Sequence, residues 1–461
     1  MGVYTSFAAK LLFPLHEHLK KHSTVAVKGA LERSQWLEPE AIRVLQLDRL
    51  RQFLGECAAH VPYYRDLFRA LDFDPAAISG IGDLARLPLL TKDIIRSEFE
   101  RLRSELPEPV RLFSTTGSTG DPLRFNISNT RISHDVAAKW RATRWWDVDI
   151  GDRELVIWSS PIELTRQDRV KQLRDCLLRS RLLPATAMSQ TDMDRFIAEI
   201  RRFAPRMLFG YPSSMTLIAQ RAEQQGVRLD DLGIRVAFCT AETLYPHQTD
   251  VMQRVFGCPV ANGYGGRDSG FIAHACPHGG MHITAEDIIV EVVDAQGRPL
   301  PPGVPGEVLV THLYSTGFPF VRYRNGDLAV LDDRPCACGR GLPLLKEVRG
   351  RTNDVLLAED GSIVLAVAIA IVLRDMPGVN GFKVIQETLQ HCRLQLVRDG
   401  SFQQSSAEQQ IRAAFRARLG EGVRLDIEYP EAIEAEASGK YRYVVSKVSQ
   451  RHVAQGGGAA G

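Results

Sequence analysis

The chain contains 461 residues, of which 44% are hydrophobic and 24% are charged, a composition typical of a soluble globular protein with a large core. Its formal net charge of +2 is too small to favour nucleic acid or an anionic membrane as the main partner. Small molecules are therefore the expected ligands, and the length predicts two or three domains.

The cysteine content and the first residues of the chain indicate a reducing cytoplasm. Eight cysteines in so long a chain are too sparse for a disulfide scaffold. Residues 1–22 lack the pattern of a cleaved signal peptide. No apolar run approaches the ~20 residues that a membrane-spanning helix needs, so no transmembrane segment is expected.

The first part of the chain has helical periodicity. Residues 11–15 include four apolar side chains, and Lys20 and Lys21 follow shortly after. This opening segment is predicted to form an amphipathic helix packed on its own domain, and a helix lying on a membrane surface is the alternative. The pattern stays helical to about residue 105, with Thr91 as a predicted helix N-cap.

Between about residues 110 and 345, short apolar strands alternate with helical stretches, which predicts a largely parallel sheet covered by helices. Strands are expected at residues 155–158, 206–210 and 236–240. In residues 280–331, strand-like pieces are separated by Gly/Pro turns, so a more antiparallel β subdomain is expected there.

After Gly350 the pattern changes to a hairpin signal, an apolar helix, two strands, a second helix and a last strand. The predicted fold class is therefore α/β, with a large N-terminal domain of several subdomains and a small α+β C-terminal domain. The expected boundaries are 1–350 for the N-terminal domain, with a helical region at 1–105, then 351–450 for the C-terminal domain and 451–461 for a disordered tail.

The segment FSTTGSTGDPLRF, residues 113–125, combines closely spaced glycines with hydroxyl side chains. Such a loop lets backbone N–H groups approach an anion, and the hydroxyls add donors, so phosphate is the expected ligand. It is not a Walker A loop, because Asp121 stands where the lysine of that motif would be. A surface turn uses the same residue types and is the alternative. The residues concerned are Ser114, Thr115, Thr116, Gly117, Ser118, Thr119 and Gly120.

Three further segments carry side chains suited to nucleotide chemistry. In NGYGGRDSG, Tyr264 can line a base and Asp268 can stand near a metal ion. In RYRNGDLAVL, Asp327 can accept hydrogen bonds from ribose hydroxyls. In EASGKYRYVV, Lys440 follows a glycine and is an isolated lysine of this region. Plain turns and a solvated lysine would explain each segment taken singly.

Taken together, in this order and at these separations, the four segments resemble the motifs of the adenylate-forming acyl-ligase superfamily. Those motifs are a Ser/Thr/Gly-rich phosphate loop, Tyr-Gly-x-x-Glu, Tyr-Arg-x-Gly-Asp, a Gly-Arg hinge and a near-terminal Gly-Lys. Further segments look like the phenylacetate–CoA ligase branch and its CapK-like relatives: HVPYYRDLFR, LPLLTKDIIRSEF, FGYPSSM, YGGRDSG and CACGR. The resemblance covers essentially residues 30–447.

The resemblance implies a two-step reaction. A carboxylate attacks the α-phosphate of ATP with Mg²⁺ and pyrophosphate leaves, and the acyl adenylate is then captured by a nucleophile, usually the thiol of coenzyme A. The phosphate loop would hold the β- and γ-phosphates, Asp268 would replace the metal-associated glutamate and Asp327 would hold the ribose. Lys440 would bridge the substrate carboxylate and ATP. The other implied positions are Ala241 and Glu242 beside adenine, Tyr264 and Gly265 in the adenine pocket, and Arg351 in the hinge.

Two residues depart from the family pattern. Asp268 is one methylene shorter than the usual glutamate, so its metal contact could run through water or a shifted loop. The hinge has Asn353 where an acidic residue is common, which bears on the domain rotation expected after adenylation.

A structural zinc site is predicted from cysteine and histidine residues in two separate segments. Cys276 and His282 lie in HACPHGGMHI, and Cys336 and Cys338 form a C-x-C pair downstream. Three thiols and one imidazole match the ligand preference and the tetrahedral number of Zn²⁺. The same pairs at similar places in relatives of this branch favour zinc over free cysteines. Two further histidines are alternative ligands: His274 and His278.

The expected function is that of an ATP-dependent acid:CoA ligase releasing AMP and pyrophosphate. The alternatives are adenylation with transfer to an amine, a hydroxyl or a carrier-protein thiol in polysaccharide or secondary-metabolite biosynthesis, and a nucleotide-binding regulator without catalysis. Retention of Lys440 and Asp327 favours an enzyme. Aromatic residues such as Trp145, Trp146 and Tyr211 favour an aryl or medium apolar acid, although core packing explains them equally well. A homodimer is compatible with the resemblance, and the oligomeric state stays open.

Overall fold

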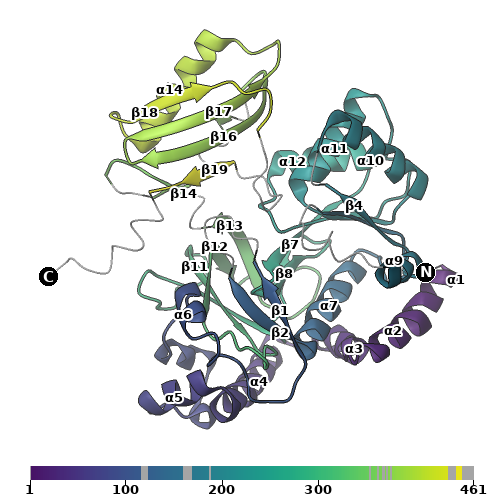
Figure 1. Cartoon of the computed structure of the whole chain (residues 1–461), viewed down its shortest axis with the longest axis vertical. Coiled ribbons are helices and arrows are strands. Elements are labelled where there is room, and N and C mark those ends of the chain that lie inside the picture. The colour runs from purple at the N-terminus through teal and green to yellow at the C-terminus, as the bar shows by residue number, and fades with distance from the viewer. Residues whose placement is uncertain are drawn as a thin grey trace. The chain divides into compact units, whose positions relative to one another are not determined.

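The computed structural model divides the chain into two compact units, Met1–Arg349 and Gly350–Gly461 (Figure 1). The structure describes residues 2–448 with the exception of the segments 116–122, 159–168, 186–187, 352–354, 361–362, 366–368, 370–371, 374–375 and 434–442. Among the described residues, no helix combines the length and the apolar character needed to cross a membrane.

The first unit begins with a run of helices that precedes its first strand. Thr91 caps α6 as predicted, because its Oγ1 accepts a hydrogen bond from the N–H of Ile94 at 3.3 Å. Phe53 of this run packs in one core with Phe320 and Tyr323, which lie more than 260 residues later in the sequence. The segments are α1 (Val3–Phe7), the π-helical turn η1 (Ala8–Leu12), α2 (Phe13–Leu19), α3 (Thr24–Ser34), α4 (Pro39–His60), α5 (Pro62–Ala70), the 3₁₀ turns η2 (Pro75–Ala77) and η3 (Ile81–Arg86), and α6 (Lys92–Ser97).

An eleven-stranded sheet forms the centre of the first unit, in the order β10-β11-β12-β13-β9-β8-β7-β6-β5-β3-β4. At one end, five strands run parallel: β3 (Glu154–Trp158), β4 (Ser180–Pro184), β5 (Met207–Gly210), β6 (Val236–Thr240) and β7 (Val260–Gly266). Strands β3, β5 and β6 are largely buried runs of mostly apolar residues, as expected for a sheet covered by helices. The helices of this half are α7 (Asn129–Arg144), α9 (Arg169–Leu177), α10 (Gln190–Phe203), α11 (Pro212–Gln224) and α12 (Pro246–Phe256).

The antiparallel half of the sheet continues the parallel half instead of forming a separate sheet. Strand β7 pairs antiparallel with β8, and β8 with β9. The strands predicted in residues 280–331 pair antiparallel in the order β10-β11-β12. The remaining strands are β8 (Gly270–Ala275), β9 (Met281–Ile283), β10 (Ile288–Val293), β11 (Gly306–His312), β12 (Tyr323–Asp332) and β13 (Leu344–Arg351), and a separate hairpin joins β1 (Val110–Ser114) to β2 (Arg124–Ser128).

The second unit is a small α+β structure with its own core. A four-stranded sheet has the order β18-β17-β16-β19, and Ile411 and Phe415 of the helix pack with Leu394 of the sheet. The elements are the hairpin β14 (Val355–Leu357) and β15 (Ile363–Leu365), then β16 (Val379–Thr388), β17 (His391–Arg398), α14 (Gln404–Leu419), β18 (Arg424–Glu428) and β19 (Val444–Ser446). The predicted α/β class, with a large first part and a small α+β second part, is confirmed.

Candidate active site and metal centre

Tyr264, Asn325 and Asp327 form a hydrogen-bonded group between β7 and β12. The Tyr264 hydroxyl donates to Asp327 Oδ2 at 2.8 Å, while Asn325 Nδ2 donates to that same oxygen at 2.9 Å and to the tyrosine oxygen at 2.8 Å. Burial, and then the negative charge of Asp327, raise the pKa of Tyr264 well above its ordinary value. The hydroxyl therefore stays protonated and acts as a donor, which orients the Asp327 carboxylate.

Asp268 lies in the turn between β7 and β8, close to this group. Its Oδ2 accepts a hydrogen bond from the Tyr323 hydroxyl at 2.7 Å, and its Oδ1 accepts one from Ser269 Oγ at 3.1 Å. Both donors are hydroxyl groups, and together they hold the Asp268 carboxylate in place. The turn itself depends on Gly265, because a Cβ at that position would lie 2.3 Å from the carbonyl oxygen of Gly270.

The fully buried side chain of Arg131, on α7, forms hydrogen bonds with the backbone of this turn. Its Nη2 donates to the backbone carbonyls of Arg267 and Asp268, at 2.9 and 2.8 Å. Its Nε lies 3.6 Å from Asp135 Oδ2. Although burial opposes it, the contacts of Asp135 with His312 and Arg131 lower the pKa of Asp135. A buried, compensated cation therefore fixes the backbone that carries Asp268.

The end of β1 brings the start of the predicted phosphate loop to the same region. The Arg267 guanidinium lies 3.4 Å from the carbonyl oxygen of Ser114. Thr115 closes the hairpin, because its N–H donates to the Leu123 carbonyl at 2.9 Å and its Oγ1 accepts from the Leu123 N–H at 3.1 Å. The other predicted loop residues, Thr116–Gly120, lie outside the described residues.

Ala241 and Glu242 follow the carboxyl end of β6, beside the end of β7. Thr240 pairs with Gly263 in the parallel sheet, so Ala241 lies one residue beyond a strand that neighbours Tyr264. Ala241 has a φ of +69°, an uncommon conformation for alanine. Glu242 accepts a hydrogen bond from the N–H of Ser213 at 3.2 Å, at the N-terminus of α11.

The structure thus brings eight predicted positions to the carboxyl edge of the parallel strands or next to it: Ser114, Thr115, Ala241, Glu242, Tyr264, Gly265, Asp268 and Asp327. This edge is where α/β sheets bind ligands. Two other predicted residues belong to the second unit: Arg351 ends β13, and Lys440 lies outside the described residues.

Sequence reasoning missed three residues of this site. Nothing in the sequence marks Arg131 except that it is a charged residue in a helical stretch. Asn325 lies in an Asn-Gly-Asp segment whose residue types are explained by a plain turn. Tyr323 has the strongest signal in hindsight, since it is the first residue of the Tyr-Arg-x-Gly-Asp motif, two positions before Asn325. All three act through partners from other parts of the chain.

Cys276, His282, Cys336 and Cys338 converge on one point, and their ligand atoms all lie within 4.8 Å of one another. Cys276 Sγ and Cys336 Sγ are 3.6 Å apart, and Cys338 Sγ is 3.2 Å from His282 Nε2. The sulfurs are too far apart for a disulfide bond. Their separation is close to the edge of a ZnS₄ tetrahedron, about 3.8 Å for Zn–S bonds of about 2.3 Å. The alternative ligands His274 and His278 are not members of this group.

The backbone around the cysteine and histidine group is shaped to bring the donors together. A Cβ at Gly280 would lie 2.6 Å from Cys336 Sγ, so only glycine permits this approach. The group also joins distant parts of the first unit. The Trp145 ring meets His282 edge-on at 5.5 Å, and its Nε1 donates to Gln35 Oε1 at 2.8 Å. Trp145, one of the candidate walls of an acyl pocket, therefore packs beside this group.

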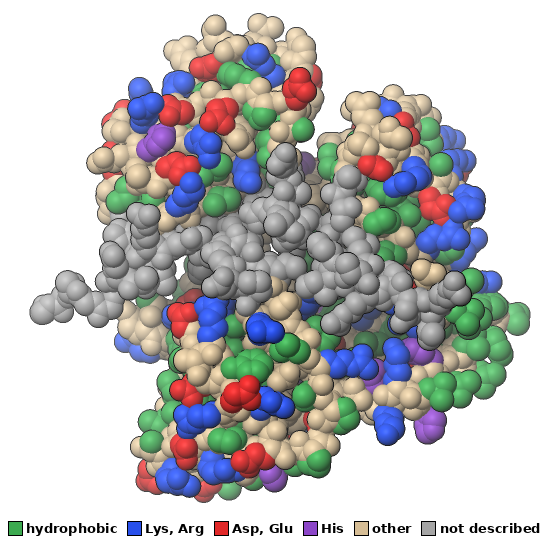
Figure 2. Space-filling view, viewed as in Figure 1, with side chains coloured by type: hydrophobic (Ala, Val, Ile, Leu, Met, Phe, Trp, Pro, Cys, Tyr) green, Lys and Arg blue, Asp and Glu red, His purple; other side chains and the backbone are tan. Residues whose placement is uncertain are grey.

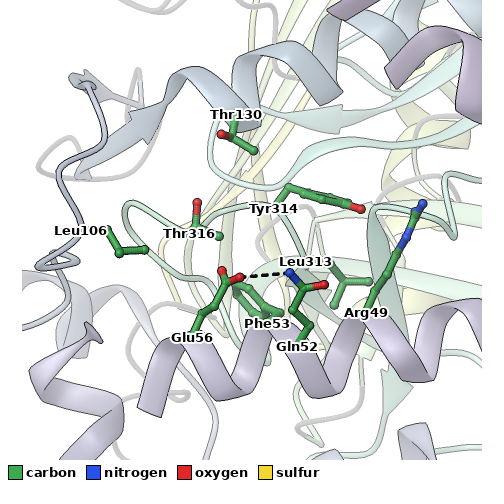
Figure 3. A pocket seen from close by; sticks show the side chains of 9 residues that line it. All are labelled: Arg49, Gln52, Phe53, Glu56, Leu106, Thr130, Leu313, Tyr314 and Thr316. Atoms are coloured by element: carbon green, nitrogen blue, oxygen red, sulfur yellow. Dashed lines mark hydrogen bonds between the residues drawn. The ribbon is translucent and has the colours of Figure 1, made fainter. Parts of the chain in front are cut away.

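A separate pocket of about 290 Å³ lies between α4 and the segment that follows β11 (Figure 3). Arg49, Glu56 and Tyr314 line it, and the Gln52 side chain donates to Glu56 at 3.1 Å. None of the predicted site residues lines this pocket. Arg49 is committed to the backbone carbonyl of Glu286, 2.5 Å away, so the pocket offers no evident anion site.

Comparisons with known proteins identify the family of the chain. The AMP-binding enzyme model matches residues 93–314, and the model of the CapK C-terminal domain matches residues 356–447. A phenylacetate–coenzyme A ligase of Thermus thermophilus is 24% identical over 421 residues, 87% of each chain. Protein CapK of Staphylococcus aureus is 21% identical over 415 residues, covering 88% of this chain and 89% of its own.

A solved structure shares the fold over nearly the whole chain. A 2-hydroxyisobutyryl-CoA ligase in the postadenylation state superposes with a TM-score of 0.73 at 20% identity, covering 92% of this chain and 94% of that chain. The family models, the relatives and the fold agree with the order of motifs in the sequence. The chain is an AMP-binding enzyme of the adenylate-forming superfamily, in the branch that contains the phenylacetate–CoA ligases and CapK.

Proposed function

We propose that the protein activates a carboxylic acid with ATP and transfers the acyl group to coenzyme A. In the first step a carboxylate oxygen bonds to the α-phosphorus, and the bond to the β-phosphate breaks to release pyrophosphate. In the second step the thiol sulfur bonds to the acyl carbon, its proton is lost and AMP leaves. The observation that carries the proposal is the convergence of Tyr264, Asp268 and Asp327 at one edge of the sheet.

The described residues have the properties that these roles require. The oriented carboxylate of Asp327 would accept hydrogen bonds from the ribose hydroxyls, and the Tyr264 ring would border the adenine. Asp268 offers carboxylate oxygens, the ligands that Mg²⁺ prefers. Mg²⁺ held there would neutralise charge on the phosphates. The positive charge of Lys440 would stabilise the negative charge that develops at the α-phosphate. Residues Ser114–Gly120 would bind the β- and γ-phosphates.

The test of the first step is ATP–pyrophosphate exchange across a panel of aryl, fatty and amino acids, with no thiol present. We expect exchange with one class of acid, because adenylation and its reversal by added pyrophosphate need the acid, ATP and Mg²⁺ but no thiol. Adding coenzyme A should then convert the adenylate to a thioester detectable by mass spectrometry. If exchange occurs but no thioester forms, the enzyme adenylates the acid, and its acyl acceptor would be an amine, a hydroxyl or a carrier-protein thiol instead of coenzyme A. Silence across the whole panel would contradict the proposal.

Zn²⁺ at Cys276, His282, Cys336 and Cys338 is the second part of the proposal. The donor set, three thiols and one imidazole, and the separations between the donor atoms fit a closed tetrahedral site. Four protein ligands leave no open position for a substrate, so the ion would act on folding and not on the reaction.

Substitution of Arg131 tests whether its contacts position Asp268. In Arg131→Met the two carbonyls lose a charged donor, and we expect pyrophosphate exchange to fall by at least about tenfold, with a raised half-saturating Mg²⁺ concentration. Arg131→Lys should restore part of the activity. Arg43→Met, at an exposed arginine of α4, is the matched control. A variant that melts earlier but keeps the parent's Mg²⁺ dependence would show that Arg131 is only structural.

The cytoplasm remains the expected compartment, because all eight cysteines are free in the structure. A homodimer remains an expectation from the family resemblance.

A further inference from the structure

The N-terminal helices carry an exposed apolar stripe that nothing in the proposed reaction uses. Five apolar side chains recur every fourth residue along α1, η1 and α2, and their exposed fractions run from 46% at Phe7 to 91% at Val3. Figure 2 shows hydrophobic side chains gathered over this part of the surface. The members of the stripe are Val3, Phe7, Leu11, Leu15 and Leu19.

The helical geometry keeps these side chains on one face. On an α-helix of 3.6 residues per turn, a four-residue repeat drifts steadily around the axis. The π-helical turn η1, Ala8–Leu12, has i→i+5 hydrogen bonds and therefore more residues per turn. In the middle of the stripe it rotates the following side chains back toward the face of the first ones. Two exposed leucines of α9, Leu173 and Leu177, extend the apolar surface, since the Tyr4 hydroxyl donates to the Leu177 carbonyl at 2.7 Å.

The opposite face of the same helices is fixed to the body of the first unit. Phe13 packs with Trp140 and Ile150 in a buried cluster. Thr5 Oγ1 donates to Asp152 Oδ1 at 2.8 Å. The predicted packing of the opening helix on its own domain therefore holds for one face, and the stripe is presented outward on a rigid support.

The charges around the stripe have one dominant sign. Residues 2–23 contain a single carboxylate, Glu17, which is 4% exposed and accepts a hydrogen bond from Thr24. The same segment has Lys10, Lys20 and Lys21. Burial, and then the nearby charge of Arg174, lower the pKa of Lys20, and Arg174 itself is paired with Asp175.

We propose that this face binds the surface of an anionic lipid bilayer, with the stripe inserted among the acyl chains and the lysines among the headgroups. Helices that lie in the membrane interface combine an apolar face containing Phe and Leu with flanking lysines, as here. Juxtamembrane lysines add attraction to anionic lipids. A second copy of the chain fits less well, because a two-fold pairing of these helices would bring lysines together without exposed carboxylates of the same segment to pair with them.

Vesicle co-sedimentation of the full chain tests the proposal. We expect binding to vesicles of phosphatidylcholine and phosphatidylglycerol, and weaker binding to phosphatidylcholine alone or at high salt. The variant Leu11→Ser/Leu15→Ser/Leu19→Ser should bind at least about tenfold more weakly, because three inserted apolar side chains are lost. Lys20→Gln/Lys21→Gln should lose about fivefold per lysine on the anionic vesicles only.

The matched control replaces three exposed apolar residues outside the stripe, Val44→Ser/Leu71→Ser/Val304→Ser, and should bind like the parent. Equal vesicle binding by the parent and the stripe variant, or no binding by the parent, would overturn the proposal. So would a dimer in sedimentation equilibrium that the stripe variant dissociates, since a second copy would then cover the stripe. Pyrophosphate exchange should be unchanged in all three variants, so failure of the lipid test leaves the proposed catalytic function untouched.

Discussion

Replacement of Lys440 by alanine should lower ATP–pyrophosphate exchange by at least about 10²-fold, the scale of removing one preorganised donor that stabilises developing charge. The lysine would stand between the substrate carboxylate and the α-phosphate, where negative charge accumulates as the new bond forms. Its removal should therefore act mainly on kcat of adenylation. The second step should survive, so a chemically prepared acyl adenylate should still be converted to the thioester.

Lys447→Ala is the matched control for this experiment. Lys447 follows β19 and forms an ion pair with Glu387, so its role is accounted for on the surface of the second unit. We expect exchange by this variant within about twofold of the parent, as for surface substitutions that change stability by less than about 0.5 kcal/mol. Parent-like exchange by Lys440→Ala would show that another residue supplies the charge.

Elemental analysis of the purified protein should find about one zinc per chain, and Cys336→Ser/Cys338→Ser should abolish it. We expect that variant to lose at least about 3 kcal/mol of unfolding free energy, a modest part of the about 10–16 kcal/mol measured for structural zinc in isolated fingers. The loss should be large because the group holds together segments far apart in the chain. Gly341, beside the C-x-C pair, donates its N–H to the Gln35 carbonyl at 3.1 Å.

Cys176→Ser provides the control, because the thiol of Cys176 is exposed on α9 and lies outside the group. It should keep its zinc and its melting temperature. Should the double variant fail to fold, treatment of the parent with a chelator answers the same question, since zinc loss and a fall in Tm should occur together. A stably folded parent without metal would contradict the site.

Much of the fold could be predicted because its signals are local. The strands at 155–158, 206–210 and 236–240 are short apolar runs that helical stretches separate, and they become β3, β5 and β6. Thr91 could be assigned as an N-cap from its own residue type and position. The joining of the parallel and antiparallel halves into one sheet could not be predicted, since strand order depends on pairings such as β13 with β9.

The candidate site divides in the same way. Tyr264, Asp268 and Asp327 were predicted because their motifs are contiguous in the sequence. Asn325 and Arg131 were not, because their roles come from hydrogen bonds to groups many residues away. A hydrogen bond of this kind leaves no periodicity in the sequence. The roles of Tyr264, Asp268 and Asp327 stay predictions, as do those of Lys440 and of residues 116–120.

Composition, periodicity and turn residues act over short distances, so the class of fold and the order of the chemical side chains follow from the sequence alone. Which of these side chains meet depends on how the chain folds. The tertiary structure placed four zinc-type ligands within 4.8 Å of one another and put a buried arginine under the Asp268 turn. The apolar stripe of the first helices is exposed to solvent, while Phe13 of the same helices is buried. These outcomes depend on long-range packing, in which burial and hydrogen bonding are settled only when distant segments come together.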